Sequence, residues 1–376
     1  MHVWIPNIFE FKGGIQVYSR FFLEALHSFK FVTGRIILKH DRRIPTSALI
    51  HFNSFQFHCL GQWPLFLRTL VFSAQLLWVA LIDRPKLIIT THLNFTPLAY
   101  YLKYFFKIPY WTIAHGVDAW DIQDSRLRQS LSNAELILSV GQYTRHRLLR
   151  EQTLQPEQVK LLPNTFNAQA FQISSKPSLL LDRYQIEYQK AIILTVARLD
   201  STERYKGYDQ IIKALPQIKA EVPDVHYILV GKGNDKSRIE KLIHDLNLEA
   251  CVTLTGFIPD EELCDHYNLC DVFAMPSKGE GFGIVYLEAL ACGKPTLGGN
   301  QDGGIDALCQ GELGALVDPD NIDEIAHTLI QILQGSYPHP LMYQPQALRQ
   351  KVIEVYGFQA FQDKLLGLLQ TTDLVN

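Results

Sequence analysis

Short apolar segments alternate with helical patterns twice along the chain. In the first half these segments lie at residues 3–6, 34–40, 49–53, 86–92, 110–116 and 136–141, and most end in polar residues or glycine. The alternation starts again with segments at residues 191–199, 226–233, 252–257, 272–277 and 295–299. This order is typical of a parallel sheet covered by helices. The sequence therefore predicts an α/β fold with two doubly wound, Rossmann-like domains.

The two alternating regions give the expected domain boundaries. We expect a first domain over residues 1–165, a linker over 166–190, which has little regular periodicity and contains the helix breaker Pro177, and a second domain over 191–349. A carboxyl-terminal helix within about residues 350–376 is expected to pack back on the first domain. Open α/β sheets bind ligands beyond the carboxyl ends of their strands, so we expect the functional site in a cleft where the two domains face each other.

Composition narrows the class of protein. Of the 376 residues 47% are hydrophobic, which excludes a disordered or low-complexity chain. The six cysteines form no C-x-x-C pair, so we expect reduced thiols and no zinc site. The first residues lack the basic and apolar stretches of a signal peptide, and a cytoplasmic location is therefore expected.

Charge is divided unevenly between the two halves. Residues 1–165 contain 18 Lys and Arg against 10 Asp and Glu, and the remainder contains 17 against 28. A basic first half suits an anionic partner such as a phospholipid surface or a lipid diphosphate, although scattered surface cations are the commoner explanation. No zinc-finger, helix-turn-helix or aromatic RNA-binding signature accompanies these cations, so we expect no nucleic-acid partner.

One segment is nearly long enough to cross a membrane. Residues 63–82 are strongly apolar but contain Arg68, Ser73 and Gln75, and Pro85 follows shortly after them. We expect a buried amphipathic helix here rather than a membrane span, and attachment to a membrane surface stays open.

The most informative motif lies at residues 272–296. An apolar strand is followed by a loop with three glycines, Gly279, Gly281 and Gly283, and then by a helix from about Ile284. Glycines allow close backbone approach to a ligand, and the free N–H groups at a helix start favour an anion such as a diphosphate.

Two carboxylates flank that helix start. Glu280 lies in the glycine loop and Glu288 in the helix. Carboxylates accept hydrogen bonds from vicinal hydroxyls, so one could hold a sugar ring and the other a ribose. Either residue alone is more commonly a solvated charge, but the glycines beside them favour the functional interpretation.

Further candidates follow other strands. Arg198 ends one strand and Lys206 precedes the next helix, so both cations could reach one diphosphate, although each could also pair with a nearby acid. In the first half, Gly14 opens a helix, and His92 and His115 follow strands. Histidines bonded to the backbone are the usual alternative, more so for His92.

These motifs resemble a known family. Residues 280–288 match an E-x7-E motif, and residues 280–296 are similar to the retaining glycosyltransferases of family four, including those of bacterial polysaccharide synthesis, which have the GT-B fold of two domains. The resemblance extends to residues 13–15, 115–116, 162–167, 196–207, 230–233 and 256–263. In that family the second domain holds the nucleotide sugar and the first holds the acceptor.

The resemblance also implies roles for single residues. It implies catalytic roles for Glu280, His115, Arg198 and Lys206. It implies donor binding by Gly14, Arg198, Lys206, Lys232, Phe257, Ile258, Glu280, Gly281, Phe282, Gly283, Ile284 and Glu288. Two departures concern the acceptor side: Ile15-Gln16-Val17 stands where the family often has an acid, and Pro163-Asn164-Thr165 replaces the common PNG.

The activity that the resemblance implies is retaining transfer of a hexose, with glucose from a UDP-sugar as the first expectation. The recipient would be a glycan or lipid-linked oligosaccharide, with peripheral contact to the inner face of the plasma membrane. No metal or other cofactor is expected, because the only D-x-D, residues 318–320, is typical of a turn.

A nucleotide-sugar epimerase and a non-catalytic nucleotide-sugar-binding protein stay open as alternatives. An NAD-dependent dehydrogenase is disfavoured because G-x-G-x-x-G is missing after the first strand.

Overall fold

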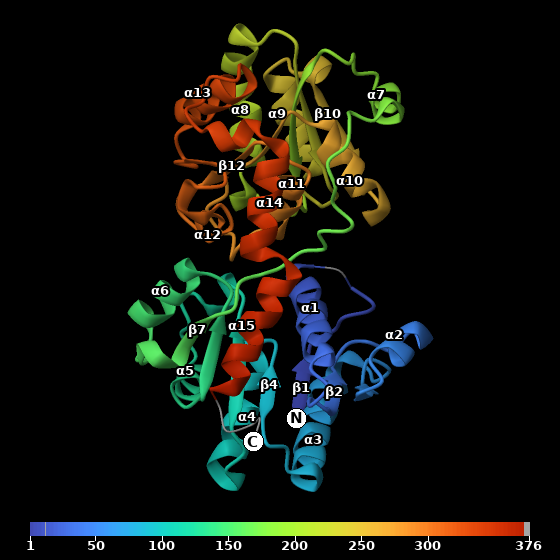
Figure 1. Ribbon diagram of the computed structural model, residues 1–376, viewed down its shortest axis with the longest axis vertical. Helices are drawn as coiled ribbons and strands as arrows, with labels where there is room; N and C mark the ends of the chain where they lie inside the picture. The colour runs from blue at the N-terminus through green and yellow to red at the C-terminus, as the bar shows by residue number, and fades with distance from the viewer. Residues whose placement is uncertain (12, 372–376) are drawn as a thin grey trace. The chain divides into compact units, whose positions relative to one another are not determined.

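The chain divides into two compact units (Figure 1). The computed structural model describes residues 1–11 and 13–371. Unit 1 comprises Met1–Thr165 together with the chain from Phe358, and unit 2 comprises Phe166–Gly357. Residues 166–190, which we expected to be a linker, lie in unit 2 and contain the helix α7 (Ser178–Tyr184).

Unit 1 is built on a parallel sheet. Among the described residues its strand order is β3-β2-β1-β4-β5-β6-β7. Strand β1 pairs with β2 on one side and with β4 on the other, and the order in which strands are added reverses between β1 and β4. The strands are β1 (His2–Ile5), β2 (Gly34–Leu38), β3 (Phe55–Cys59), β4 (Ile88–Thr90), β5 (Tyr110–Ala114), β6 (Leu136–Ser139) and β7 (Val159–Leu161).

The α-helices of unit 1 cover this sheet. They are α1 (Gly14–Ser28), α2 (Thr46–His51), α3 (Leu65–Asp83), α4 (Thr96–Phe106), α5 (Ser125–Ser132), α6 (Gln142–Glu151) and α15 (Phe358–Gln370). Residues of α3, α4, α5 and α6 share one apolar cluster with the strands. On α1, the Tyr18 ring lies 5.6 Å from that of Phe361, so α15 is the carboxyl-terminal helix that belongs to unit 1. Residues 372–376 of the expected helix lie outside the described residues.

Unit 2 repeats the architecture. Its described strands have the order β10-β9-β8-β11-β12-β13 and all pair in parallel. They are β8 (Ala191–Val196), β9 (Val225–Val230), β10 (Val252–Gly256), β11 (Val272–Met275), β12 (Thr296–Gly299) and β13 (Ala315–Val317). Besides α7, its α-helices are α8 (Tyr208–Glu221), α9 (Lys236–Asp245), α10 (Asp260–Leu269), α11 (Ile284–Ala291), α12 (Gly304–Ala307), α13 (Ile322–Leu333) and α14 (Pro345–Tyr356).

Some predicted elements differ from the structure at the sheet edges. The strand predicted over residues 49–53 is wrong: helix α2 covers most of it, and the edge strand β3 follows at residues 55–59. A short apolar run cannot be assigned to strand or helix by composition alone. The edge strands β7 and β13 were not predicted. Unlike the equally short central strand β4, neither is buried throughout.

Helix α3 confirms a helix over the apolar segment at 63–82, but it is not buried as expected. Phe72, Leu76 and Ala80 are buried against the sheet, whereas much of the opposite side is exposed. Within the described part of the chain, α3 is long and apolar enough to cross a membrane by length and composition alone. Only 22% of its most apolar 18-residue stretch is buried. A helix that covers a sheet buries one side only, so a buried helix could not be inferred from the apolar composition of α3.

A buried carboxylate fixes the loop between β1 and α1. Asp41 is fully buried and accepts hydrogen bonds from the backbone N–H groups of Ile8, Phe9 and Glu10 at 2.7, 2.9 and 2.9 Å. Hydrogen bonds to a charged acceptor are stronger than neutral ones, and their loss leaves buried donors unsatisfied. Asp41 therefore holds the loop that leads to Gly14.

We predict that Asp41→Ala lowers the free energy of unfolding of unit 1 by about 2–4 kcal/mol, because three backbone donors lose their acceptor. Urea denaturation followed by circular dichroism measures the change. Glu157→Ala, at an exposed acid of the same unit, is the control and should change stability by less than about 0.5 kcal/mol. Equal effects of the two substitutions would contradict this role of Asp41.

Candidate functional site

Loops from neighbouring strands meet at the carboxyl edge of the unit 2 sheet. Gly207 ends the loop after β8, and a Cβ at that position would lie 2.2 Å from the carbonyl oxygen of Pro276. A Cβ on Gly303, in the loop after β12, would lie 2.1 Å from the carbonyl oxygen of Gly281. Both neighbours belong to the loop at residues 276–283, so glycine is needed for these loops to pack backbone against backbone.

This packing joins Lys206 to Glu280. Lys206 ends the short helix before α8, Glu280 lies in the 276–283 loop, and the Lys206 Nζ and Glu280 Oε1 atoms form an ion pair. Only 16% and 14% of the two side chains are exposed, so each charge depends on the other. Burial lowers the pKa of Lys206 to about 8, while Glu203 raises it and the nearby Arg198 lowers it further. The sequence predicted both residues, and the structure brings them together.

The buried side chain of Asp302 holds the loop at residues 276–283 in place. Its carboxylate accepts hydrogen bonds from Ser277 Oγ at 2.7 Å, from Glu280 N at 2.7 Å and from Gly304 N at 2.8 Å. It is fully buried, and burial raises its pKa to about 7 although these bonds lower it. Asp302 therefore sets the position of the backbone at Glu280.

Helix α11 begins directly after the loop. Gly283 has φ of 89°, a left-handed conformation that favours glycine, and Ile284 is the first helical residue. The first N–H groups of a helix have no partner within it and point towards its amino end. Phe282 is buried, so Gly281, Phe282, Gly283 and Ile284 form a fixed turn between Glu280 and the helix.

The second glutamate of the motif is oriented by a tyrosine. Glu288 lies on α11, and its Oε2 accepts a hydrogen bond from Tyr267 on α10 at 2.7 Å. Burial raises the pKa of the Tyr267 phenol well above its usual value, so this hydroxyl stays protonated and able to donate.

The remaining predicted residues of unit 2 lie in the adjoining loops. Arg198 follows β8, is mostly exposed and forms an ion pair with Glu203. Lys232 follows β9, and its Nζ lies 4.9 Å from the centre of the Phe257 ring. Phe257 is 64% exposed, whereas Ile258 beside it is buried. An exposed aromatic ring next to a cation offers a stacking surface.

The candidates of unit 1 are His115, after β5, and Gly14, at the start of α1. His115 follows β5, and its Nε2 lies 2.9 Å from the Thr91 carbonyl oxygen, to which it donates. Burial lowers the pKa of His115 to about 4, so the ring is neutral at neutral pH. Its backbone N–H donates to Asp118 Oδ1 at 2.9 Å. Gly14 is exposed at the first turn of α1, and a Cβ there would meet nothing within 4 Å.

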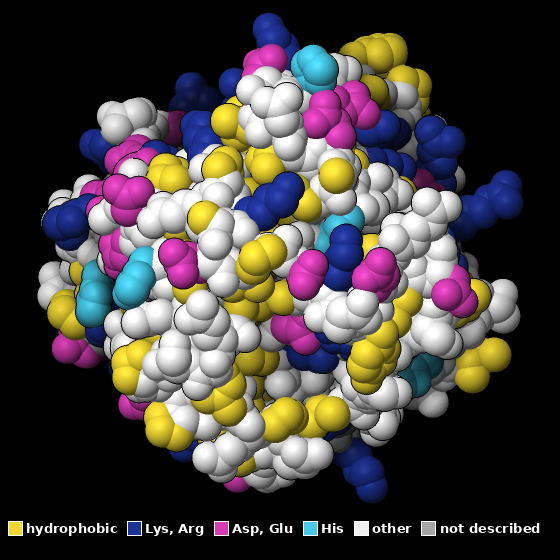
Figure 2. Space-filling model, turned by 90° about the horizontal axis from the view of Figure 1, so that it is seen from above, with side chains coloured by type: hydrophobic (Ala, Val, Ile, Leu, Met, Phe, Trp, Pro, Cys, Tyr) yellow, Lys and Arg dark blue, Asp and Glu magenta, His cyan; other side chains and the backbone are white. Residues whose placement is uncertain are grey.

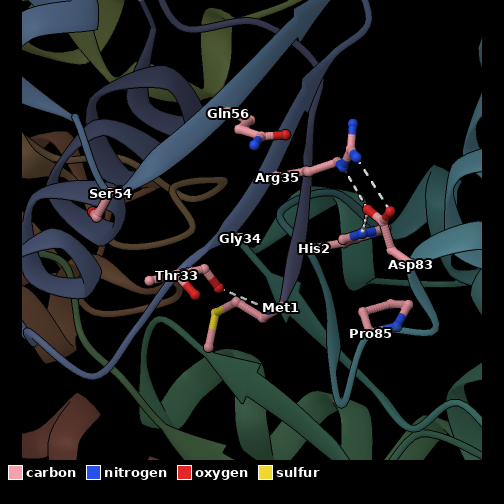
Figure 3. A pocket seen from close by; sticks show the side chains of 9 residues that line it. All are labelled: Met1, His2, Thr33, Gly34, Arg35, Ser54, Gln56, Asp83 and Pro85. Atoms are coloured by element: carbon pink, nitrogen blue, oxygen red, sulfur yellow. Dashed lines mark hydrogen bonds and ion pairs between the residues drawn. The ribbon is translucent and has the colours of Figure 1, made fainter.

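A pocket of about 340 Å³ lies at the edge of the unit 1 sheet where β1, β2 and β3 begin (Figure 3). Figure 3 shows His2 and Arg35 directed at Asp83, and His2 Nε2 lies 2.9 Å from Asp83 Oδ2. Burial raises the pKa of Asp83, but the bonds from His2 and Arg35 outweigh it and leave the pKa lowered. These groups satisfy one another, and no predicted site residue lines this pocket.

Sequence reasoning missed the supporting residues Asp302 and Tyr267. The pairing of Arg198 with a nearby acid, an alternative that the sequence left open, is present as its ion pair with Glu203. Asp302 follows the strand end at Gly299 and precedes Gly303-Gly304, which is a signal for a tight turn at the same sheet edge. Tyr267 had no local signal, because it acts on Glu288, which is brought near only by the fold.

The sequence comparisons match mainly the second unit. Residues 181–354 match the family model "Glycosyl transferases group 1". A GDP-mannose-dependent alpha-(1-6)-phosphatidylinositol monomannoside mannosyltransferase of Mycolicibacterium smegmatis is 30% identical over 55% of this chain and 55% of its own. The O-antigen chain mannosyltransferase B of Escherichia coli is 26% identical over 58% and 57%. The chain thus spans about half the length of these curated relatives.

The structural comparisons cover both units. HepE of Anabaena, solved with UDP, matches with a TM-score of 0.80 and 18% identity over 99% of each chain. A sucrose-phosphate synthase from Thermosynechococcus elongatus matches with a TM-score of 0.80 and 22% identity over 98% of each chain. At these identities the likeness establishes the fold: two Rossmann-like domains with parallel sheets, as in the GT-B glycosyltransferases. The predicted fold class is confirmed.

We predict that Asp302→Asn removes part of the pH dependence of stability. A carboxyl whose pKa rises from 3.8 to about 7 on folding stabilises the native state below pH 4, and this contribution is lost as the pH rises through 7. The stability difference between wild type and Asp302→Asn should therefore change between about pH 4 and pH 7, with wild type losing more. Denaturant unfolding at several pH values measures it, and parallel curves for the two proteins would refute the assignment.

Proposed function

We propose that the chain is a glycosyltransferase that transfers a hexose from a nucleoside diphosphate sugar to a hydroxyl acceptor, with retention of anomeric configuration. The observation that carries the proposal is the buried Lys206–Glu280 ion pair beside the start of α11. A cation, a carboxylate and helix N–H groups together suit a diphosphate joined to a polyhydroxylated ring. The match of residues 181–354 to glycosyltransferases supports the same activity.

In this proposal unit 2 binds the donor. Lys206 and Arg198 neutralise the diphosphate, and the N–H groups at residues 281–284 donate to its oxygens and to the sugar. Entry of the diphosphate gives Lys206 a new anionic partner and frees Glu280 to accept hydrogen bonds from sugar hydroxyls. Glu288, already oriented by Tyr267, accepts from the ribose hydroxyls. The base lies by Lys232, Phe257 and Ile258.

The reaction exchanges one bond at the anomeric carbon for another. The bond from that carbon to the diphosphate oxygen breaks with oxocarbenium character, and the acceptor oxygen bonds to the same face. The proton of the acceptor hydroxyl moves to the departing diphosphate, so no protein nucleophile is required. Cations at the diphosphate stabilise the charge that develops on it. The proposal also assigns roles to two residues of unit 1: the neutral ring of His115 and Gly14 at the exposed amino end of α1.

We propose that protein cations serve in place of a metal. The residues of the D-x-D sequence already have structural roles: Asp318 Oδ1 accepts from Asp320 N at 2.9 Å, and Asp320 pairs with Lys278. These contacts fit the expected turn. Lys206 and Arg198 supply positive charge in the loops where the diphosphate is proposed to bind.

Two donors are favoured by different observations. A UDP-sugar, with UDP-glucose first, follows from the sequence resemblance and agrees with the UDP bound to HepE. GDP-mannose is named for the Mycolicibacterium smegmatis relative, which is more similar in sequence. Calorimetric titration with UDP, GDP and then the corresponding sugar nucleotides separates the two.

The proposed acceptor is a glycan or lipid-linked saccharide of surface polysaccharide synthesis. The names of the relatives include a phosphatidylinositol mannoside enzyme and an O-antigen enzyme, and residues 1–165 carry the excess of positive charge. We propose that the enzyme acts in the cytoplasm, peripheral to the inner face of the plasma membrane.

Two alternatives are distinguished by product analysis. An epimerase would convert the donor without an acceptor, and a binding protein would bind the donor without turnover. Formation of an acceptor-dependent product would exclude both.

We predict that Lys206→Ala and Glu280→Gln each lower transfer by about 10²–10³-fold, because each removes a charge that acts at the reacting group. Release of nucleoside diphosphate from the sugar nucleotide measures turnover, and circular dichroism checks folding. Lys278→Ala is the matched control, since Lys278 lies in the same loop but pairs with Asp320. Wild-type turnover in the Lys206 and Glu280 variants would refute the proposed site.

We predict that affinity for the nucleoside diphosphate falls as the pH rises past about 8. Lys206, whose pKa is lowered to about 8, carries its charge below that pH and loses it above. Between about pH 7 and pH 9 we expect a three- to tenfold loss, measured by calorimetry. In Lys206→Arg the guanidinium stays charged, so a flat profile is expected. An equal fall in Lys206→Arg would show that another group titrates.

A further inference from the structure

We propose that unit 1 rests on an anionic membrane surface through the exposed sides of α3 and α4. The side chains that enter the interface, here called the apolar surface, are Phe66, Leu70, Trp78 and Ile82 of α3 with Tyr104 and Phe105 of α4. This identifies the part of unit 1 that makes the peripheral contact proposed above, and it holds whether or not the chain transfers sugar.

An unbroken apolar stripe runs along α3. Phe66, Leu70, Trp78 and Ile82 are 82%, 68%, 66% and 60% exposed, and Ala74 completes their spacing of four residues. Residues four apart lie on one side of a helix, so the stripe covers nearly its whole length. An exposed apolar strip of this length on a water-soluble surface is a signal for an interaction site.

The carboxyl ends of α3 and α4 lie at one edge of the sheet. Ile88 starts β4 a few residues after α3, and Tyr110 starts β5 a few residues after α4; these two residues pair. Both helices also pack into one apolar cluster, and the ring of Phe72 on α3 lies 4.9 Å from that of Phe95, which directly precedes α4. Tyr104 and Phe105, 60% and 65% exposed, lie in the last turn of α4 and add exposed aromatic rings at this edge.

The charges at this edge favour an anionic partner. Arg84 and Lys107 directly follow the two helices and are exposed. The nearby acids are already paired: Asp83 with Arg35, and Glu135 with Lys103 at 2.7 Å. Basic residues beside apolar and aromatic side chains are the composition that binds the headgroup region of anionic bilayers.

The helix lies on the membrane rather than across it, because its other side is held within the protein. Arg68 is buried, and its guanidinium donates to the carbonyl oxygens of Gly61 and Trp63 at 2.7 and 2.8 Å. Phe72 and Leu76 pack in the core. Crossing a bilayer would break these contacts and place Arg68 in hydrocarbon, which is costly.

Charged side chains interrupt the hydrophobic ones on the face of the molecule that Figure 2 shows. On the face drawn in Figure 2, basic, acidic and hydrophobic side chains are interspersed. Along the α3 stripe no charged side chain interrupts the exposed positions, because Arg68 is buried and Asp83 is bound by Arg35 and His2. Tyrosine and tryptophan at such a surface suit the boundary between water and acyl chains, where a ring can be half buried.

Sedimentation with vesicles tests the inference. We expect the full chain to bind vesicles of phosphatidylcholine mixed with phosphatidylglycerol, more weakly at high salt, and to bind pure phosphatidylcholine poorly. Phe66→Ser/Leu70→Ser/Trp78→Ser should lower partitioning by about tenfold or more. Arg84→Glu/Lys107→Glu should remove the preference for anionic vesicles. Leu179→Ser/Tyr188→Ser, at exposed apolar positions of unit 2, is the matched control and should bind as wild type.

Two outcomes would overturn the proposal. Wild type that stays in solution with anionic vesicles contradicts it directly. Wild type that forms dimers in size-exclusion chromatography, with the triple variant monomeric and neither bound to vesicles, would make the apolar surface an interface between two copies. Lys206→Ala separates this inference from the proposed activity: it should bind vesicles as wild type even where transfer is lost.

Discussion

The buried ion pair between Lys206 and Glu280 is the interaction on which the account of unit 2 depends. Neither charge is stable alone in that environment, since transferring an ion out of water without a partner costs several kcal/mol. The pair therefore requires that two loops, 74 residues apart in sequence, be held together. It also leaves a cation and a carboxylate ready to exchange partners when an anion with hydroxyl groups enters.

The fold meets that requirement through parallel strands and close backbone packing. Parallel strands bring their carboxyl ends to one edge, so the loops after β8, β9, β11 and β12 start side by side. Gly207 and Gly303 then let the neighbouring loops touch the 276–283 loop directly. Asp302 adds hydrogen bonds beneath Glu280. The charged side chains are consequently positioned by backbone rather than by flexible contacts, as preorganised electrostatic stabilisation requires.

The central strands and the charged site residues could be predicted from the sequence, and the edges could not. Strands such as β5 and β9, buried throughout, appear as largely apolar runs. The edge strand β7 has the exposed Lys160 at its centre and gave no such run. Glu280 and Lys206 stood in local motifs, whereas Asp302 reaches Glu280 across 22 residues of sequence through packing alone. For α3 the sequence predicted a helix but not which side the sheet would cover, and the exposed stripe follows from that.

The most direct test of the central claim is a crystal structure of the chain with a bound nucleoside diphosphate, UDP and GDP being tried in turn. We expect diphosphate oxygens within hydrogen-bond distance of Lys206 Nζ and of the backbone N–H groups at residues 281–284, with Glu280 turned away from the lysine. A diphosphate bound in another part of the molecule, with the Lys206–Glu280 pair intact, would contradict it.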